Sequence, residues 1–232
     1  MKKSDELIST AVNWYIETRP IYEELSHEVE NIIHENSYEN NPPIHAIFNR
    51  TKDIESFAKK IANEKYTDPS SQITDLSAIR IIACVENDLS KISKLIESIF
   101  EIDYDNSIDK SKSLGTDKVG YRSIHYVARL PSRLTKLPEY RKFKNLRFEI
   151  QIRTLLQHAW AEIEHDRNYK FSGKLPEDLT RRLKVLAGVL ELADREFNQI
   201  ANEVEKYELT SKTVEENLKI QNNSSTYKFN SN

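Results

Sequence analysis

The chain has 232 residues, of which 38% are hydrophobic and 31% charged, and its formal net charge is −3. This length and composition indicate an ordinary soluble globular protein that can bury one full hydrophobic core. The small net charge excludes a general attraction to nucleic acid or membrane, so a polyanion would have to bind at a local patch.

The sequence predicts neither a membrane span nor an export signal. No run approaches the ~20 apolar residues that cross a bilayer. The N-terminal stretch carries acids where a signal peptide needs an unbroken apolar run. The single cysteine, Cys84, excludes a disulfide framework and fits a reducing cytoplasm. Because Cys84 lies in an apolar run, we expect a buried thiol without a catalytic role.

Residues 1–43 are predicted to form an N-terminal helical segment. A helical pattern runs from about Asp5 to His34, bent or broken near Pro20, and the Asn- and Pro-containing segment 35–43 ends it. Its second half carries apolar residues at helical spacing, which predicts a buried stripe. These residues are Tyr22, Leu25, Val29, Ile32 and Ile33.

Residues 44–175 are predicted to form the core domain, which begins with a short strand and a helix. The strand carries Arg50 and Lys52, and Lys60 follows two turns into the helix. These cations either cluster near the helix start or belong to a solvated charged helix.

The apolar run from Ala78 to Val85 is typical of a central strand with both faces covered. Arg80 interrupts this run, and burying an unpaired ion costs several kcal/mol or more. Arg80 therefore needs an acid or an anionic ligand. Asp75 lies just before the strand, and both a structural pair with Asp75 and a functional role remain open.

The next segments predict a helix, a loop and another strand. Asn87 or Asp88 is expected to cap a helix that runs to Phe100, and the polar stretch 101–119 to be a long loop with or without one short strand. The strand in residues 120–130 then places Tyr121, Ser123 and His125 on one face.

The stretch 147–170 changes period from strand to helix at Thr154, which is predicted to be the N-cap. The strand places Glu149, Gln151 and Arg153 on one face. The helix continues this polar face at three- and four-residue steps with His158, Glu162, His165 and Tyr169. The pattern fits either an edge strand with a surface helix or a concave polar site.

The remaining sequence predicts C-terminal helices over 176–216 and a disordered tail over 217–232. The helical part carries an apolar stripe that must be buried against the domain or another subunit, which makes a homo-oligomer possible. Its members are Leu183, Leu186, Leu190, Phe197, Ile200 and Val204. Together these patterns predict an α/β fold with a mixed sheet of about five strands, flanking helices and added helices at both ends.

The chain has four glycines, from which no Walker loop, GxGxxG or GxSxG can be written. Side chains would therefore have to hold any nucleotide. Asp75 and Glu149 offer oxygen ligands of the kind that a divalent cation uses in phosphoryl transfer, and Tyr121 offers a ring for stacking a base. A zinc site at His158, Glu162 and His165 is disfavoured, because the spacing lacks HExxH and no cysteine is near.

Four motifs in register resemble the synthetase domain of the RelA/SpoT family, which makes the alarmone (p)ppGpp. They are RTKDIESFAKKI, DLSAIRIIACVEND, GYRSIHYVARL and FEIQIRTLLQHAWAEIEHDRNYK. The similarity covers residues 44–171. No hydrolase domain precedes it in this sequence, so the chain resembles the small, single-domain synthetases.

The resemblance implies a nucleotidyltransferase-like sheet and transfer of the β,γ-pyrophosphate of ATP to a ribose 3′-hydroxyl, with Mg²⁺. Asp75 and Glu149 would hold the magnesium, and Glu149 would also take the acceptor proton. The ATP phosphates would be held by Arg50, Lys52, Lys60 and Arg80. The acceptor GDP or GTP would be held by Tyr121, His125, Gln151 and Arg153, and by His158, where many relatives have an asparagine that contacts the guanine.

Two alternatives stay open beside this interpretation. The stretches QHAWAEIEHD and LAGVLELADREF resemble a toxin-like branch of the family, some members of which modify the 3′ end of tRNA, and a toxin would need an antitoxin. A segment with Lys136, Arg141, Lys142, Lys144 and Arg147 is either a tRNA-binding patch or a solvated loop. A catalytically silent nucleotide-sensing module is the other alternative, and the presence of Asp75, Tyr121 and Glu149 argues against it.

Overall fold

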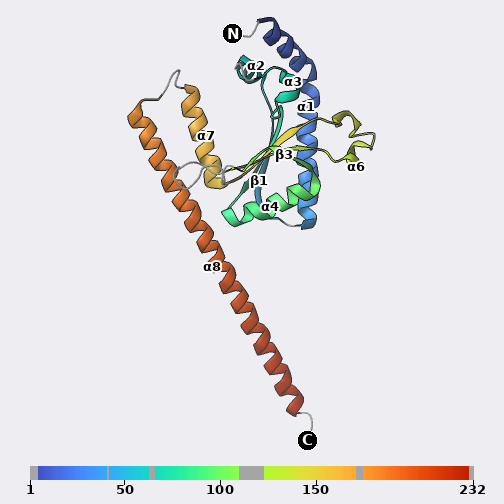
Figure 1. The fold of residues 1–232 in the computed structure, drawn as a ribbon. Helices are drawn as coiled ribbons and strands as arrows, with labels where there is room; N and C mark the ends of the chain where they lie inside the picture. The colour runs from blue at the N-terminus through green and yellow to red at the C-terminus, as the bar shows by residue number, and fades with distance from the viewer. Residues whose placement is uncertain (1–4, 41, 63–65, 110–122, 171–174, 230–232) are drawn as a thin grey trace.

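In the computed structural model, residues 5–40, 42–62, 66–109, 123–170 and 175–229 are described (Figure 1). The helices are α1 (Asp5–Asn40), α2 (Ile54–Ala62), α3 (Pro69–Gln72), α4 (Glu86–Ile99), α6 (Ser132–Thr135), α7 (Leu155–Lys170), α8 (Glu177–Phe229) and the short 3₁₀ helix η1 (Arg141–Phe143). The strands are β1 (Ile44–Thr51), β2 (Ser77–Ala83), β3 (Glu101–Asp109), β4 (Ile124–Arg129) and β5 (Phe148–Thr154).

The five strands form one mixed sheet in the order β1-β2-β5-β4-β3. Strands β2 and β5 are parallel, and the other neighbouring pairs are antiparallel. The predicted α/β fold with a mixed five-stranded sheet is therefore confirmed. β2 and β5 each have a neighbouring strand on both sides, so their backbones and the directions of their side chains are fixed by hydrogen bonds to two strands.

One face of the sheet is apolar and packs against helices α1 and α4. Alternate residues of β5, such as Phe148 and Ile150, are fully buried on this face, as period-two alternation predicts. The predicted stripe of α1 is buried in the same core, as are the inward residues of α4. Figure 1 shows α1 running along the sheet. The other face is left for polar side chains.

Helix α1 continues through Pro20 and ends at Asn40 rather than at the predicted His34. Proline removes the N–H that would bond the carbonyl of Ile16, but Ile16 is half exposed, so water can reach that group. Near the C-terminal end, Asn36 and Ser37 donate to the carbonyls of Ile32 and Ile33 at 2.8 and 2.6 Å. These turn-favouring residues are therefore accommodated inside the helix.

Two predictions for the middle of the chain are wrong, the burial of Cys84 and the N-cap of α4. Cys84 is exposed, because β2 ends at Ala83 and the thiol lies beyond the covered part of the sheet. The segment 101–119 was predicted to be a long loop with or without one short strand, and residues 101–109 form the strand β3, which pairs with β4. Helix α4 begins at Glu86 after Val85, with no side-chain cap, so neither Asn87 nor Asp88 is the N-cap.

Helix α8 is long, and most of its apolar stripe is exposed. Leu186, Phe197, Ile200 and Val204 are each about half exposed, so the domain does not bury the stripe. The helix continues to Phe229 across the segment where composition predicts disorder. No proline or glycine follows Gly188, so the backbone meets no helix breaker there. Within the described part of the chain, no helix combines the length and apolarity needed to cross a membrane.

Candidate active site

The polar face of the sheet carries two rows of residues that run across neighbouring strands. In one row Phe48 pairs with Arg80, Arg80 with Gln151, and Gln151 with His125. In the other, Arg50 pairs with Ala78, and Ala78 with Glu149. The rows lie two residues apart along each strand, so their side chains point the same way. Strand register thus brings together residues up to a hundred positions apart in sequence.

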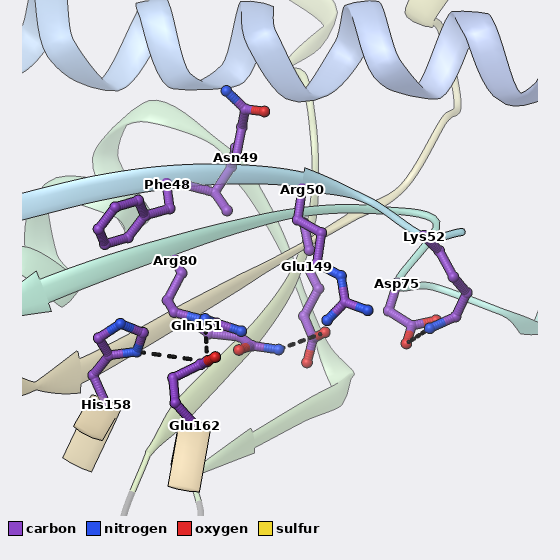
Figure 2. A pocket seen from close by; sticks show the side chains of 12 residues that line it. Phe48, Asn49, Arg50, Lys52, Asp75, Arg80, Glu149, Gln151, His158 and Glu162 are labelled. Atoms are coloured by element: carbon purple, nitrogen blue, oxygen red, sulfur yellow. Dashed lines mark hydrogen bonds and ion pairs between the residues drawn. The ribbon is translucent and has the colours of Figure 1, made fainter. Parts of the chain in front are cut away.

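Helix α7 closes over these rows and forms a cavity of about 360 Å³. This volume falls in the range of small-molecule sites. Figure 2 shows the arrangement: Asp75 and Lys52 lie at one end, Glu149 and Arg50 in the middle, and Phe48, His158 and Glu162 at the other end. The lining residues are Phe48, Asn49, Arg50, Lys52, Asp75, Ala78, Ile79, Arg80, Glu149, Gln151, His158 and Glu162.

Asp75 is held between two lysines. Its Oδ2 accepts hydrogen bonds from Lys52 Nζ at 2.8 Å and from Lys60 Nζ at 2.9 Å. Burial alone would raise the pKa of Asp75, but the two ammonium groups outweigh it and lower this pKa below its ordinary value. Asp75 is therefore ionised at neutral pH. Its other oxygen, Oδ1, is buried and has no hydrogen-bond partner among the described residues.

Helix α1 fixes the backbone of Lys52. The hydroxyl of Tyr15 donates to the Lys52 carbonyl at 2.6 Å, and Arg19 Nε donates to the same carbonyl at 3.4 Å. Lys52 N–H in turn donates to the carbonyl of Leu76 at 3.0 Å, next to Asp75. The N-terminal helix thereby sets the position of a pocket cation.

Glu149 lies at the centre of a hydrogen-bond network on the sheet. Its Oε1 is 2.6 Å from His125 Nδ1, and its Oε2 accepts from Gln151 Nε2 at 3.0 Å. Arg153 Nη2 donates to Gln151 Oε1 at 2.7 Å, which fixes the orientation of that amide. Burial opposes ionisation of Glu149, but the bonds from His125 and Gln151 keep its pKa below the ordinary value. Glu149 is therefore also a carboxylate at neutral pH.

The tautomer of His125 follows from these contacts. An ionised carboxylate only accepts hydrogen bonds, so His125 Nδ1 carries the hydrogen that faces Glu149. In the neutral ring, Nε2 is then left to accept from the hydroxyl of Ser123, 2.7 Å away. The chain Ser123–His125–Glu149 holds the carboxylate in one orientation.

At the far end of the cavity, Arg80 pairs with Glu162 of helix α7. Arg80 Nη1 lies 2.6 Å from Glu162 Oε1, so the proposed structural pair with Asp75 does not form. Asp75 is instead occupied by Lys52 and Lys60, which flank it from the end of β1 and from α2. The prediction that Arg80 needs an acidic partner therefore holds, but the partner is Glu162, 82 positions away in the sequence.

His158 lies beside this pair and stacks on Phe48. The two ring centroids are 5.8 Å apart with an interplanar angle of 28°. Burial and the neighbouring Arg80 lower the pKa of His158, so its ring is neutral at neutral pH. Its Nδ1 is 3.9 Å from Glu162, beyond hydrogen-bond distance. Two flat side chains therefore border this end of the cavity.

Three buried nitrogens around this end have no hydrogen-bond partner among the described residues: Arg80 Nε, Arg153 Nε and His158 Nδ1. Burial and the nearby Arg80 charge lower the pKa of Arg153 to about 10, which still leaves it protonated at neutral pH. Buried polar atoms without partners are costly in a finished core but are useful where a ligand supplies the partners. Phosphate or base oxygens would accept hydrogen bonds from the two guanidinium nitrogens.

Helix α7 begins with a reciprocal cap that confirms Thr154 as its N-cap. Gln157 N–H donates to Thr154 Oγ1 at 3.1 Å, and Thr154 N–H donates to Gln157 Oε1 at 3.0 Å. This is a capping box, which ends the strand and starts the helix at one residue. His158 then lies one turn from the cap and Glu162 two turns from it.

The structure brings most of the predicted site residues together. Arg50, Lys52, Asp75, Arg80, Glu149, Gln151 and His158 line the cavity. Lys60, His125 and Arg153 lie outside the lining but bond directly to residues in it. Tyr121, predicted to stack on the acceptor base, lies outside the described residues.

Phe48 was not predicted to belong to the site, although it stands two residues before Arg50 on the same strand and period-two spacing could have found it. Helical spacing placed Glu162 on the polar face one turn after His158, but no role in the site was assigned to it. Asp194, which contacts Thr154, carries no such signal, because it lies on a different helix far along the chain.

The carboxylates also meet the chemical requirements of a magnesium site. Mg²⁺ takes oxygen ligands and commonly uses one or two carboxylates together with substrate phosphates. Asp75 and Glu149 are both ionised, and the buried Oδ1 of Asp75 has no described partner. No group of three or more His, Cys, Asp or Glu side chains suited to a metal occurs within the described ranges. Such a site would thus be completed by phosphate oxygens.

Comparison with known proteins places these residues in a known family. A family model described as a region found in RelA / SpoT proteins matches residues 49–174. GTP pyrophosphokinase YjbM of Bacillus subtilis (strain 168) is 29% identical over 195 residues, which are 81% of this chain and 87% of the relative. GTP pyrophosphokinase YwaC of the same organism is 30% identical over 169 residues, which are 70% of this chain and 76% of the relative.

The fold is similar to a solved structure with a nucleotide product. The small alarmone synthetase 1 from Bacillus subtilis, bound to its product pppGpp, superposes with a TM-score of 0.65 at 28% sequence identity. The match covers 83% of this chain and 96% of that chain. The fold described above is therefore similar to that of a protein whose solved structure contains pppGpp.

Proposed function

Since the chain belongs to the RelA/SpoT family, we propose that it transfers the β,γ-pyrophosphate of ATP to the ribose 3′-hydroxyl of GDP or GTP, making (p)ppGpp. One observation carries this proposal: two ionised carboxylates and four cationic side chains meet in and beside a single cavity within the matched region. The relatives named GTP pyrophosphokinase and the pppGpp-bound synthetase support the same reaction.

The cations are placed to hold the phosphates of ATP. Lys52 and Lys60 flank Asp75, while Arg50 and Arg80 project from the neighbouring strands β1 and β2. Phosphoryl-type transfers gain most from positioning and from neutralising the charge on the phosphate oxygens. Arg50 is about half exposed and bonds only at the 4.0 Å limit to Asp53, so it can turn toward a ligand at little cost.

Glu149 is assigned to the acceptor proton. In the proposed step, the 3′-oxygen attacks the β-phosphorus, the bond from that phosphorus to the α-phosphate oxygen breaks, and AMP leaves. The hydroxyl proton passes to a Glu149 oxygen, which the bonds from His125 and Gln151 hold in place. Asp75 and Glu149 are also the side chains that would hold Mg²⁺, which when bound would neutralise phosphate charge.

The acceptor side is assigned to residues of β4, β5 and α7. Gln151, Arg153, His125 and His158 carry donors and acceptors on this side, and two of their nitrogens, Arg153 Nε and His158 Nδ1, have no hydrogen-bond partner among the described residues. Tyr121 remains a prediction for base stacking. GDP and GTP both carry the acceptors that such donors require.

A different acceptor, the 3′ end of tRNA, has one structural observation in its favour. Lys136, Arg141, Lys142 and Lys144 are exposed around η1, on the segment that leads into β5. One of them, Lys142, pairs with Glu24 of α1, which lowers the charge free for a phosphate backbone. If tRNA is the acceptor, the protein is a translation toxin that requires a neutralising antitoxin.

A transfer assay decides between these acceptors. Purified protein, Mg²⁺ and ATP labelled at the γ-phosphate are offered GDP, GTP, ATP or total tRNA in separate reactions. Label on GDP or GTP supports the proposal. Label on tRNA alone replaces it with the toxin function, and no label on any acceptor leaves the silent nucleotide-sensing module as the better account.

The proposal includes self-association through α8. Leu186, Leu190, Ala193, Phe197, Ile200 and Val204 follow one another at alternating steps of four and three residues. This is the a/d spacing of a coiled coil, and four of the six are about half exposed on the isolated chain. A second copy offers the same stripe, so an isologous helix pair would cover it.

A further inference from the structure

Helix α8 reaches the start of the pocket helix α7 through a buried carboxylate. Thr154 Oγ1 donates a hydrogen bond to Asp194 Oδ2 at 2.5 Å. Thr154 is 0% exposed, Gln157 3% and Asp194 2%, so water does not compete at this junction. Asp194 lies 20 residues beyond the segment 49–174 that the family model matches.

We propose that Asp194 is a positioning residue for the transfer reaction: through Thr154 it fixes the first turn of α7 and hence the places of His158 and Glu162 in the cavity. This inference rests on the proposed function. Asp194 itself does not line the cavity and is assigned no contact with the substrate.

The hydroxyl of Thr154 takes part in two hydrogen bonds at once. Its oxygen accepts the N–H of Gln157 in the capping box, and its hydrogen must then point to another acceptor. Asp194 supplies that acceptor and so orients the oxygen toward α7. Without it, a buried hydroxyl would lose a partner and the cap would lose its fixed geometry.

A carboxylate is a costly choice for this place. Burial raises the pKa of Asp194 to about 6, against the opposing bond from Thr154, and its Oδ1 has no hydrogen-bond partner among the described residues. An apolar side chain would pack α8 against the domain at lower cost. The cost of burying this carboxylate is explained if its bond to Thr154 fixes the geometry of the site.

A second set of contacts fixes the register of α8 on the domain. Asn198 Oδ1 accepts the N–H of Asn87 at 2.8 Å, and Asn202 Oδ1 accepts from Asn87 Nδ2 at 2.6 Å. Asp194, Asn198 and Asn202 follow at four-residue steps, so one polar stripe of α8 faces the domain. This stripe binds the starts of both α7 and α4, and it allows little sliding of Asp194 past Thr154.

The test compares steady-state kinetics of the full chain for ATP and for the accepted nucleotide. Asp194→Ala is expected to lower kcat/KM for the acceptor about tenfold while the protein stays folded. Asp194→Asn keeps an oxygen for the Thr154 hydroxyl and should recover to within about threefold of wild type. Glu203→Ala removes an exposed carboxylate from the same helix and should match wild type. The KM for ATP should move less than the KM for the acceptor.

Two variants of Thr154, the partner of Asp194, distinguish loss of this hydrogen bond from a general folding defect. Thr154→Ser keeps the hydroxyl and should behave as wild type. Thr154→Val loses both the bond to Asp194 and the cap bond from Gln157 N–H, so it should be impaired at least as much as Asp194→Ala. The double variant Thr154→Val, Asp194→Ala should be no worse than Thr154→Val alone, because Thr154→Val already removes the bond that Asp194→Ala removes. The ring resonances of His158, followed by NMR, should shift in Asp194→Ala and return in Asp194→Asn.

Wild-type kinetics and an unshifted His158 ring in a folded Asp194→Ala would overturn the inference. So would a loss in Asp194→Ala that only follows the fraction of folded protein and is not restored by Asp194→Asn. If wild-type protein transfers nothing to any acceptor, the proposed function fails instead, and the His158 resonances still test the positioning role.

Discussion

At the scale of single residues, the site depends on carboxylates that stay ionised although they are buried. We predict that Glu149→Gln keeps the fold and lowers the transfer rate by at least about 100-fold, because the amide cannot take the acceptor proton. Initial rates with saturating ATP measure the loss, and a thermal unfolding midpoint within a few degrees of wild type shows that the fold is kept. A wild-type rate in this variant would contradict the assignment.

Asp75 should also contribute to stability in a pH-dependent way. Lys52 and Lys60 lower its folded pKa below the ordinary 3.8, so its contribution is present above that value and is lost as the pH falls through the lowered pKa. We expect Asp75→Asn to reduce the free energy of unfolding at pH 7 by about 1–3 kcal/mol. Urea denaturation should show this deficit at pH 7 and a smaller one at pH 3, and an equal deficit at both would contradict the pairing.

Residue types and local spacing were enough to predict most residues of this site. They were not enough to predict which of these side chains pair with one another. Glu149, Gln151 and Arg153 were placed on one strand face because period two is a local property. The need of Arg80 for an acid was also predictable, since burial demands it. Its partner Glu162 was not, because that choice depends on how α7 lies over the sheet.

At the scale of elements, helix α8 joins the domain through a polar stripe that includes Asp194. Its pKa of about 6 lies above the ordinary 3.8, so the folded state binds more protons between these values and stability falls as the pH rises through this window. We predict that the free energy of unfolding of Asp194→Asn does not fall in this window. The difference in this free energy between the variant and wild type should therefore shift in favour of the variant by up to about 3 kcal/mol from pH 4 to pH 7. Denaturation curves at both pH values measure the change, and a constant difference would contradict the burial of a charged Asp194.

Elements with amphipathic patterns were predictable, whereas the segment 101–119, where a strand depends on distant pairing, could only be predicted as a loop with or without one short strand. The buried stripes of α1 and α4 follow from helical spacing within each segment. Strand β3 has a polar, turn-like composition and becomes a strand because β4 offers it an edge. The exposure of Cys84 likewise depends on where the sheet ends.

At the scale of the whole molecule, the exposed stripe of α8 is expected to pair two copies of the chain. We predict that Phe197→Glu combined with Ile200→Glu yields a monomer, because charges at two central a/d positions cannot be buried together. Light scattering on size-exclusion fractions gives the molar mass, with Glu203→Ala as the control on the same helix. An identical mass for wild type and the double variant would contradict pairing through this stripe.

We predict that an intact pyrophosphate group moves from ATP to the acceptor, and the position of the label in the product shows whether it does. Wild-type protein is given GDP or GTP with ATP labelled either at the β- or at the γ-phosphate. Both labels should reach the acceptor in equal amounts, AMP should form in the same amount, and Glu149→Gln should transfer neither. Transfer of the γ-label alone, with ADP as the second product, would contradict the account.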